Sequence, residues 1–317
     1  MKDKLHDIYL PFTEDEIKEH FVQSVKDLDN IKKHISKYKK SIDNYKLFET
    51  NQYSEKNIKL IRQIEKDETF WTASSLMTIF HSKNSINELQ KLLMLAFGEK
   101  PPLDNFDNWA NCLNGELRLF FEPNIPSPKG YQVWLKNNVT NRNFIPYIVE
   151  HAQNKKNEFR LDLEGPTNVD ALLLNITNGF SIFIEAKVLS DISYQVSFDS
   201  TRNQIIRNID VMLSSNNENL EAPLKLRKPE NSLFILLTPE LFKKLPNTRL
   251  YGFKFNEYKT NPISISNELA HRKLNLADCV NISKRIGWTT WEDLKLINSN
   301  CCKWFDINNN NENTASA

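Results

Sequence analysis

Residues 169–188 read VDALLLNITNGFSIFIEAKV and predict two neighbouring β-strands. Val169–Leu174 and Ser181–Val188 are rich in branched and aromatic apolar residues, which is typical of strands in a protein core. The dipeptide Asn178-Gly179 between them is a strong signal for a hairpin turn. We therefore expect the two strands to lie side by side.

The second strand carries charge inside an apolar stretch. Alternation places Phe183, Glu185 and Lys187 on one face of the strand. The opposite face is wholly apolar and requires a covering helix; it comprises Ile182, Ile184, Ala186 and Val188. A charge in such a strand is costly unless it is paired or bound to a metal ion.

Asp170 lies at the start of the first strand, so the hairpin allows its carboxylate to approach that of Glu185. Two carboxylates, together with carbonyl groups and water, form the hard oxygen site that Mg²⁺ prefers. The alternative is that Glu185 and Lys187 form a partly exposed ion pair on an edge strand. Such a pair contributes little to the stability of the fold.

Further elements are expected on both sides of the hairpin. An apolar stripe over residues 144–152 predicts a helix, and the alternating residues 159–163 predict a strand. Residues 199–214 predict a second helix, and the apolar run 232–237 predicts a buried strand. The expected order is helix, three strands, helix, strand.

This pattern resembles the PD-(D/E)xK nuclease superfamily, which has the restriction-endonuclease-like fold. The matching residues are Asp170 and, after fourteen intervening residues, Glu185-Ala186-Lys187, within the element order given above. The resemblance covers about residues 142–240, and Val169 stands where the family has proline.

The resemblance implies metal-dependent hydrolysis of a phosphodiester. Asp170 and Glu185 would hold Mg²⁺, for which Mn²⁺ would substitute, with help from the carbonyl group of Ala186. Lys187 would orient the attacking water and stabilise charge on the scissile phosphate. An ammonium fixed beside a metal ion supplies positive charge where the transition state needs it.

Three accessory residues are expected around this set. Glu164, beside the turn that leads to Asp170, is a candidate third carboxylate for the metal, in preference to Glu150, which lies opposite the stripe of its own helix. Arg202 falls on the apolar stripe of helix 199–214, so it faces a phosphate or a carboxylate near the sheet, or pairs with a neighbour such as Asp199. Gln204 is a candidate substrate contact, because the family often has a polar residue on this helix.

The first hundred residues predict helices only. Ile17, Phe21 and Ile35 belong to a stripe with helical spacing, and a further helix runs through residues 86–97 with Ser85 as its N-cap and Gly98 as its stop. Pro101-Pro102 introduces a segment rich in Asn, Pro and Gly. We expect an all-helical N-terminal region over residues 1–125 and a nuclease core with a C-terminal extension over residues 126–317.

Composition limits the choice of function. The chain has 317 residues, 40% hydrophobic and 26% charged, with a formal net charge of +1. This is typical of a globular protein and gives no general basic field, although a basic groove for DNA remains compatible with it. No Gly-rich phosphate loop or Gly-x-Ser-x-Gly elbow occurs, which argues against an ATPase or a serine hydrolase.

The expected location is the cytoplasm. The N-terminal residues are charged rather than apolar, and no segment has the apolar length of a membrane helix, so we expect no membrane association. The four cysteines form no Cys-x-x-Cys pair, so free thiols are expected.

The sequence thus predicts an α+β protein whose αβββαβ core, with a central mixed sheet, follows a helical region. The expected function is a Mg²⁺-dependent DNA endonuclease of restriction or phage-defence type, with a homodimer expected by analogy. A non-catalytic nucleic-acid-binding or assembly module with the same fold is the alternative, and a helical interaction protein is a third reading. Trp288 and Trp291 are expected to form a core pair rather than a base-stacking platform.

Overall fold

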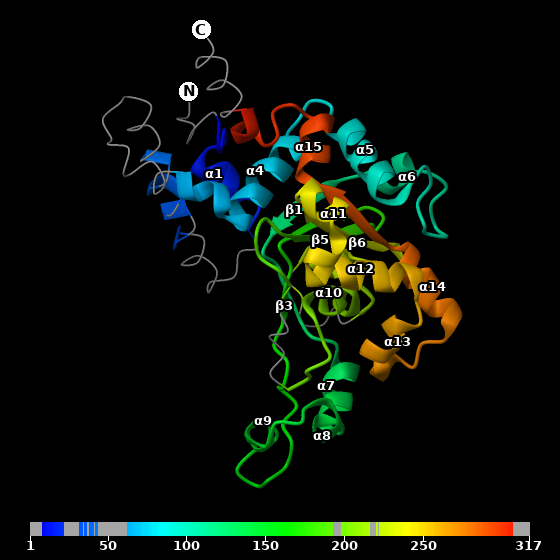
Figure 1. Ribbon diagram of the computed structural model, residues 1–317. Coiled ribbons are helices and arrows are strands. Elements are labelled where there is room, and N and C mark those ends of the chain that lie inside the picture. Colours follow the sequence, from blue (N-terminus) through cyan, green and yellow to red (C-terminus); the bar gives the residue numbers. More distant parts are fainter. Residues whose placement is uncertain are drawn as a thin grey trace.

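The computed structural model describes residues 8–21, 32–33, 35–36, 38–40, 42–43, 62–192, 198–215, 220 and 222–306. Its centre is a five-stranded mixed sheet with the strand order β1-β4-β5-β6-β7 (Figure 1). The strands are β1 (Leu117–Phe121), β4 (Ala171–Asn175), β5 (Ser181–Ala186), β6 (Ser232–Thr238) and β7 (Ile286–Thr290). β4 is antiparallel to both of its neighbours, β1 and β5. The strands β5, β6 and β7 run parallel to one another.

The hairpin predicted from Asn178-Gly179 is confirmed. β4 and β5 pair in antiparallel fashion, with Ala171 opposite Ile184 and Leu174 opposite Ser181. Gly179 has a positive φ of 78°, a conformation that glycine adopts without the steric cost of a Cβ atom. The turn fixes the register of the strands and hence which side chains face each other.

One face of the sheet is covered by α4 (Glu68–Phe80), α5 (Ser85–Phe97) and α15 (Trp291–Ile297). Ile182, Ile184 and Ala186 lie in this layer, as the alternation along β5 predicts. The same hydrophobic cluster includes Tyr9 near one end of the chain and Trp304 near the other. Residues far apart in the sequence therefore share one core.

The other face packs on α10 (Gln204–Met212), α12 (Leu250–Thr260), α13 (Ser264–Glu268) and α14 (Leu276–Lys284). Phe183 on β5 lies in this second core with Ile205 and Ile209 of α10. The helix predicted over residues 199–214 is thus present in a shorter form, and the side chain of Asn203 caps its first turn.

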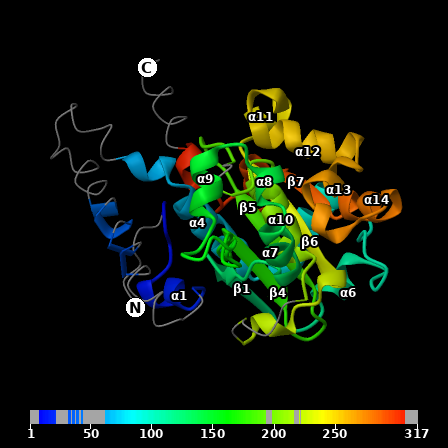
Figure 2. The same ribbon diagram turned by 90° about the horizontal axis from the view of Figure 1, so that it is seen from below.

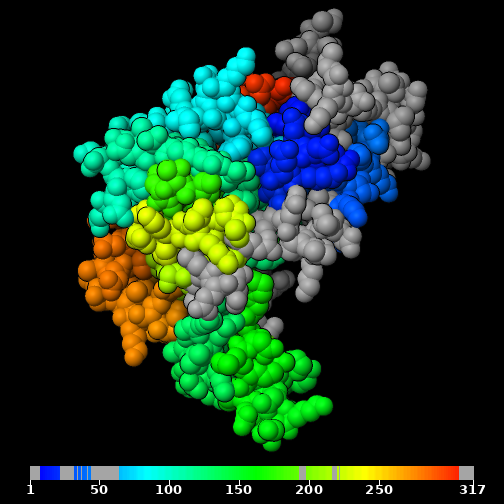
Figure 3. Space-filling model, turned by 180° about the vertical axis from the view of Figure 1, so that it is seen from behind, coloured from blue at the N-terminus to red at the C-terminus, as the bar shows by residue number. Residues whose placement is uncertain are grey.

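Residues 126–166, which we call the arm, extend away from the sheet (Figures 1 and 3). The ribbon of β2 (Asn124–Ile125) and β3 (Thr167–Asn168) connects the arm to the sheet. Its helices α7 (Lys129–Lys136), α8 (Val139–Arg142) and α9 (Pro146–His151) enclose a small separate core. Seen from below, α7 and α8 overlap α10, and α9 lies to their left (Figure 2).

Shorter elements complete the described chain. The α-helices are α1 (Glu14–Lys18), α6 (Trp109–Leu113) and α11 (Glu240–Lys244). The 3₁₀ helices are η2 (Arg62–Lys66), η3 (Leu224–Leu226), η4 (Pro229–Asn231), η5 (Pro246–Thr248), η6 (Ala270–Arg272) and η7 (Lys303–Asp306).

The structure corrects the expectation of an all-helical N-terminal region. Strand β1 lies within residues 1–125 and pairs with β4, and α4 and α5 of the same region cover the sheet. The expected boundary at residue 125 therefore does not separate two cores. The strand expected over residues 159–163 is also absent, since Phe159 makes only an isolated bridge to Gln153. β1 takes the place of that strand at the edge of the sheet.

The long helix expected from Ile17 to Ile35 is not formed as one element. α1 ends at Lys18, and Phe21 makes an isolated parallel bridge to Phe121 of β1. Positions 22–31 of the expected stripe lie outside the described residues. The helix expected over residues 86–97 is confirmed as α5, with Gly98 at its C-cap, but its N-cap is Asn84, and the expected cap Ser85 is its first residue.

Candidate active site

Asp170 and Glu185 meet across the β4–β5 hairpin. The register that pairs Ala171 with Ile184 places Asp170 opposite Glu185 when it is continued by one residue. The Asp170 carboxylate accepts a hydrogen bond from the backbone N–H of Ala186, over 2.7 Å. Glu185 is completely buried, whereas Asp170 is partly exposed. The predicted approach of the two acids is thus present at the end of the sheet.

Lys187 completes this group. Its Nζ lies 2.5 Å from Glu185 Oε1 and 3.1 Å from the carbonyl oxygen of Ala186. The backbone of Lys187 is held on both sides, because its N–H donates to Leu237 of β6 and its carbonyl accepts from the Trp291 indole. The backbone of Lys187 is therefore fixed, and its side chain directs the ammonium toward the two acids.

Asn208 of α10 is a member of the site that sequence reasoning did not find. Its Nδ2 donates to Glu185 Oε2 over 2.8 Å, so Glu185 has a partner on each carboxylate oxygen. The side chain is completely buried. The sequence does contain a signal for Asn208. It lies three positions after Ile205, so a polar side chain falls on the apolar face of the helix.

Glu68 is a second residue that sequence reasoning missed. It is the first residue of α4, and its Oε2 accepts from Val188 N–H over 2.8 Å and from the Ser190 hydroxyl over 2.6 Å. Its negative charge raises the pKa values of Asp170 and Lys187. Glu68 and Asp170 are about a hundred residues apart, and no local pattern in the sequence connects them.

Burial and mutual repulsion control the charge of the acids. Burial raises the pKa of Asp170 well above its ordinary value, and the charge of Glu185 raises it further. Burial also raises the pKa of Glu185, against the opposing effect of Lys187. Burial disfavours charge on Lys187, but Glu185 and Asp170 outweigh it, so the pKa of Lys187 is raised and the ammonium stays protonated.

The donor atoms suit Mg²⁺. Asp170 and Glu185 provide carboxylate oxygens, and the Ala186 carbonyl adds a third hard donor beside them. Within the described residues, no group of three or more His, Cys, Asp and Glu side chains forms a preassembled metal cage. Mg²⁺ commonly binds through only one or two carboxylates, with water and substrate phosphate as its other ligands. The donor types therefore fit this ion, and in this structure Lys187 and Asn208 engage the two carboxylate oxygens of the buried Glu185.

The structure does not bring Glu164 together with the two acids. Glu164 accepts from Arg202 Nε over 2.8 Å and from the Ser127 hydroxyl over 3.1 Å. Arg202 also pairs with Asp210 over 2.7 Å, and its guanidinium lies 3.7 Å from the centre of the Tyr131 ring. The expectation that Arg202 faces carboxylates holds, but these are not the acids of the candidate site.

Asp199, the other partner considered for Arg202, pairs with Arg142 over 3.0 Å. Arg202 has no exposed surface, so it does not offer a contact to a substrate in this conformation. Gln204 begins α10 and is partly exposed. The polar residue of this helix that touches the site is Asn208, one turn later.

Two other expectations concern buried residues. Trp288 and Trp291 both lie in the core and form no surface platform, but the expected pair is wrong, because they belong to the cores on opposite faces of the sheet. The cysteines Cys112, Cys279, Cys301 and Cys302 are free and buried.

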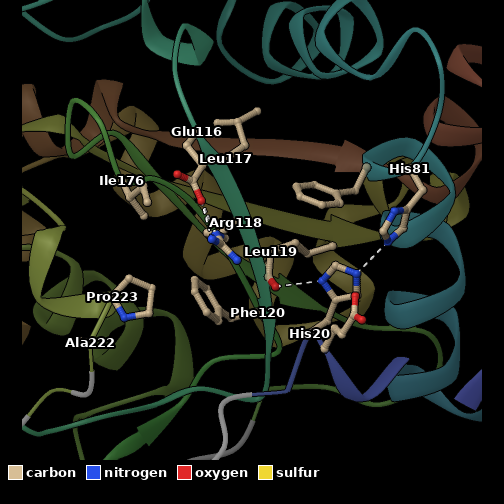
Figure 4. Close-up of a pocket in the computed structure, with 12 residues that line it drawn as sticks. His20, His81, Glu116, Leu117, Arg118, Leu119, Phe120, Ile176, Ala222 and Pro223 are labelled. Atoms are coloured by element: carbon tan, nitrogen blue, oxygen red, sulfur yellow. Dashed lines mark hydrogen bonds and ion pairs between the residues drawn. The ribbon is translucent and has the colours of Figure 1, made fainter. Parts of the chain in front are cut away.

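A pocket of about 550 Å³ lies away from the candidate site, along β1 (Figure 4). His20 and His81 line it, and their Nε2 atoms are 2.7 Å apart. His20 Nδ1 faces the carbonyl oxygen of Leu119 over 3.0 Å. This pair joins the N-terminal segment to the end of α4 and to β1.

Comparison with protein-family models, with curated proteins and with solved structures gives no match for this chain. Within the described part of the chain, no helix combines the length and apolar character needed to cross a bilayer.

Proposed function

We propose that the protein is a Mg²⁺-dependent deoxyribonuclease of the PD-(D/E)xK type. The observation that carries the proposal is the convergence of Asp170, Glu185 and Lys187 on one point, with the lysine ammonium 2.5 Å from a buried carboxylate. A protein that only binds DNA gains nothing from burying these charges, because each is costly to desolvate. The resemblance of the motif and the order of the elements support the same reaction.

The order of elements supports the proposal in a revised form. α4 and α5 supply the first helical layer, and β1, β4 and β5 are the three strands that follow. α10 and β6 then complete the order helix, strand, strand, strand, helix, strand. The arm is an insertion between the first and second strands of this series.

In the proposed reaction, Asp170, Glu185 and the Ala186 carbonyl hold the ion. The bound ion would acidify water and polarise the scissile phosphate. Lys187 would supply positive charge beside the phosphate, since Glu185 and Asp170 raise its pKa against the effect of burial. Asn208 keeps Glu185 oriented, and Glu68 fixes the backbone that follows Lys187. Glu68, instead of Glu164, is the proposed third acid.

The proposed substrate is DNA, and the proposed location is the cytoplasm. A dimer is the arrangement by which many enzymes of this family cut duplex DNA, and we propose it here by analogy only. Restriction or phage defence is the corresponding proposed role, from the common use of the family.

The test compares the wild-type protein with Lys187→Ala on supercoiled plasmid, linear duplex and RNA, with Mg²⁺ and with EDTA. Lys254→Ala is the matched control, since Lys254 also pairs with a buried carboxylate, that of Glu268, but lies outside the site. We expect cleavage by the wild type and the control that requires Mg²⁺ and is lost in Lys187→Ala. DNA retention without cleavage by any protein would contradict the proposal and support the binding module.

A further inference from the structure

The arm presents aromatic side chains that the rest of the molecule leaves uncovered. Phe144 is 84% exposed and Tyr147 is 73% exposed, at the start of α9. Ile145 between them is also exposed, and contiguous exposed apolar side chains are typical of interaction sites. Both residues lie on the part of the arm farthest along the chain from its two connections to the sheet.

The exposed ring of Tyr147 is the end of a stack. Tyr147 and His151 are nearly parallel, with an interplanar angle of 9° and centroids 6.1 Å apart. His151 and the buried Phe198 are also nearly parallel, at 17° and 6.3 Å. The stack begins in the core of the arm and stops at the surface. Its outer end offers a planar aromatic group held in a defined orientation.

The charge around these rings is positive. The arm, residues 126–166, contains six Lys and Arg against four Asp and Glu, and one of the four, Glu164, is buried and paired with Arg202. Lys155 and Lys156, which follow α9, are exposed. Two identical positive surfaces would repel each other, so a polyanion complements the arm better than a second copy of it. Aromatic groups combined with basic groups are the usual means of binding unpaired nucleic acid, because every base has a face for stacking.

The connections of the arm place it next to the candidate active site. β3 leads from the arm directly to Val169 and Asp170, and β2 leaves the sheet just after β1. Two ion pairs hold the arm to the loop and helix after β5: Arg142 with Asp199, and Glu164 with Arg202. The root of the arm thus lies at the end of the sheet that carries Asp170, and a strand bound at Phe144 and Tyr147 would reach that end by following the arm toward β3 (Figure 1).

We propose that Phe144 and Tyr147 stack on unpaired bases, so that the substrate is DNA with a single-stranded segment beside the position of cleavage. This inference rests on the proposed function in one respect, because only a nuclease would have the bound DNA as its substrate. The stacking site itself is a binding property and is tested separately. Positioning residues orient the arm relative to the site through two ion pairs, Arg142 with Asp199 and Glu164 with Arg202.

The experiment measures binding by fluorescence anisotropy in the Asp170→Asn background, where cleavage is blocked. The probes are a single-stranded oligonucleotide, its duplex, and a forked duplex of the same sequence. We expect Phe144→Ala with Tyr147→Ala to weaken binding of the single strand and the fork about tenfold or more, with little effect on the duplex. Phe253→Ala, which removes a half-exposed ring from α12, is the matched control and is expected to change nothing.

Two further substitutions separate stacking from general apolar contact. Trp at positions 144 and 147 is expected to restore binding, whereas Leu at both is expected not to. Restoration by Leu, or an equal loss in Phe253→Ala, would overturn the inference. Loss of a dimer in sedimentation, with binding of single strands unchanged, would identify the patch as a contact between copies and would also overturn it.

Cleavage is measured in parallel on the forked and duplex DNA with proteins that retain Asp170. Cleavage that is indifferent to Phe144 and Tyr147 would contradict the arm inference alone. Aromatic-dependent binding without cleavage by the wild type would contradict the nuclease proposal alone.

Discussion

The charge state of single residues determines what the candidate site can bind. The hairpin places Asp170 opposite Glu185, Lys187 pairs with Glu185, and burial raises the pKa of both acids. A raised pKa favours the protonated carboxyl group. Proton and Mg²⁺ therefore compete for the same oxygen atoms.

This competition gives a pH prediction. The pKa of Asp170 is raised in the folded state, so folding favours its protonated form, and this stabilisation is lost as the pH rises through the raised pKa. Without Mg²⁺, the melting temperature should fall as the pH increases above the ordinary carboxyl range. Mg²⁺ should stabilise the protein increasingly over the same range, since it binds the deprotonated acids.

The measurement is a series of thermal melts against pH, with and without Mg²⁺, on the wild type and Asp170→Asn. The variant should show a flatter pH response and no shift with Mg²⁺. An equal Mg²⁺ shift in both proteins would place the ion elsewhere.

Arg202 carries a stability prediction. Arg202→Met leaves Glu164 and Asp210 without their shared cation, and all three side chains are at most slightly exposed. Breaking such a buried network costs about 3–5 kcal/mol of unfolding free energy. Arg118→Ala, which removes the exposed pair with Glu116, should cost less than about 1 kcal/mol. Urea denaturation of both variants measures the two changes in unfolding free energy. Similar small decreases in both variants would show that the network around Arg202 does not stabilise the fold.

At the scale of elements, local patterns predicted what local interactions determine. The alternation along β5 and the Asn178-Gly179 turn are short-range signals, and they placed the hairpin, Asp170 and the Glu185–Lys187 pair correctly. The helix α10 and strand β6 follow from continuous apolar patterns.

Long-range pairing could not be found in the same way. β1 pairs with β4 across about fifty residues of chain, and the arm occupies most of that interval. The residues 159–163 have the alternation of a strand but no neighbouring strand with which to pair. Glu68 reaches the site only because α4 packs on β5, and this packing is a property of the whole core.

The contact between the N-terminal segment and β1 gives a second pH prediction. His20 accepts at its carbonyl from Phe121 N–H over 2.7 Å, and its ring contacts His81. Burial lowers the pKa of both imidazoles below 6.5, with Glu19 acting in the opposite direction on each. The folded state therefore resists protonation, and its stability falls as the pH drops below about 6.5.

Thermal melts of wild type and His81→Gln between neutral and mildly acidic pH test this expectation. The variant should lose part of the acid sensitivity, since one of the two titrating rings is gone. Acid sensitivity that is the same in both proteins would show that other groups cause it.

The whole molecule is one cooperative unit around the sheet. The core under α4, α5 and α15 includes Tyr9, Leu173 and Trp304, so both ends of the described chain contribute to it. A fragment of residues 126–317 would lose β1 and the layer formed by α4 and α5. It would expose the apolar face of β4 and β5 to water.

We therefore expect this fragment to be unfolded or aggregated, whereas the full chain melts in a single transition. Far-UV circular dichroism and size-exclusion chromatography of the fragment provide the measurement. A soluble, cooperatively folded fragment would show that residues 126–317 form an independent domain after all.

The register of the hairpin also restricts how this protein can vary. Asp170 and Glu185 stay face to face only when residues are inserted or deleted in equal number on both sides of the turn. They remain on the side of α10 only when that number is even, since an odd number on each strand would turn both side chains over. An unmatched single-residue insertion between the two acids would therefore abolish the site while leaving its three residue types intact in the sequence.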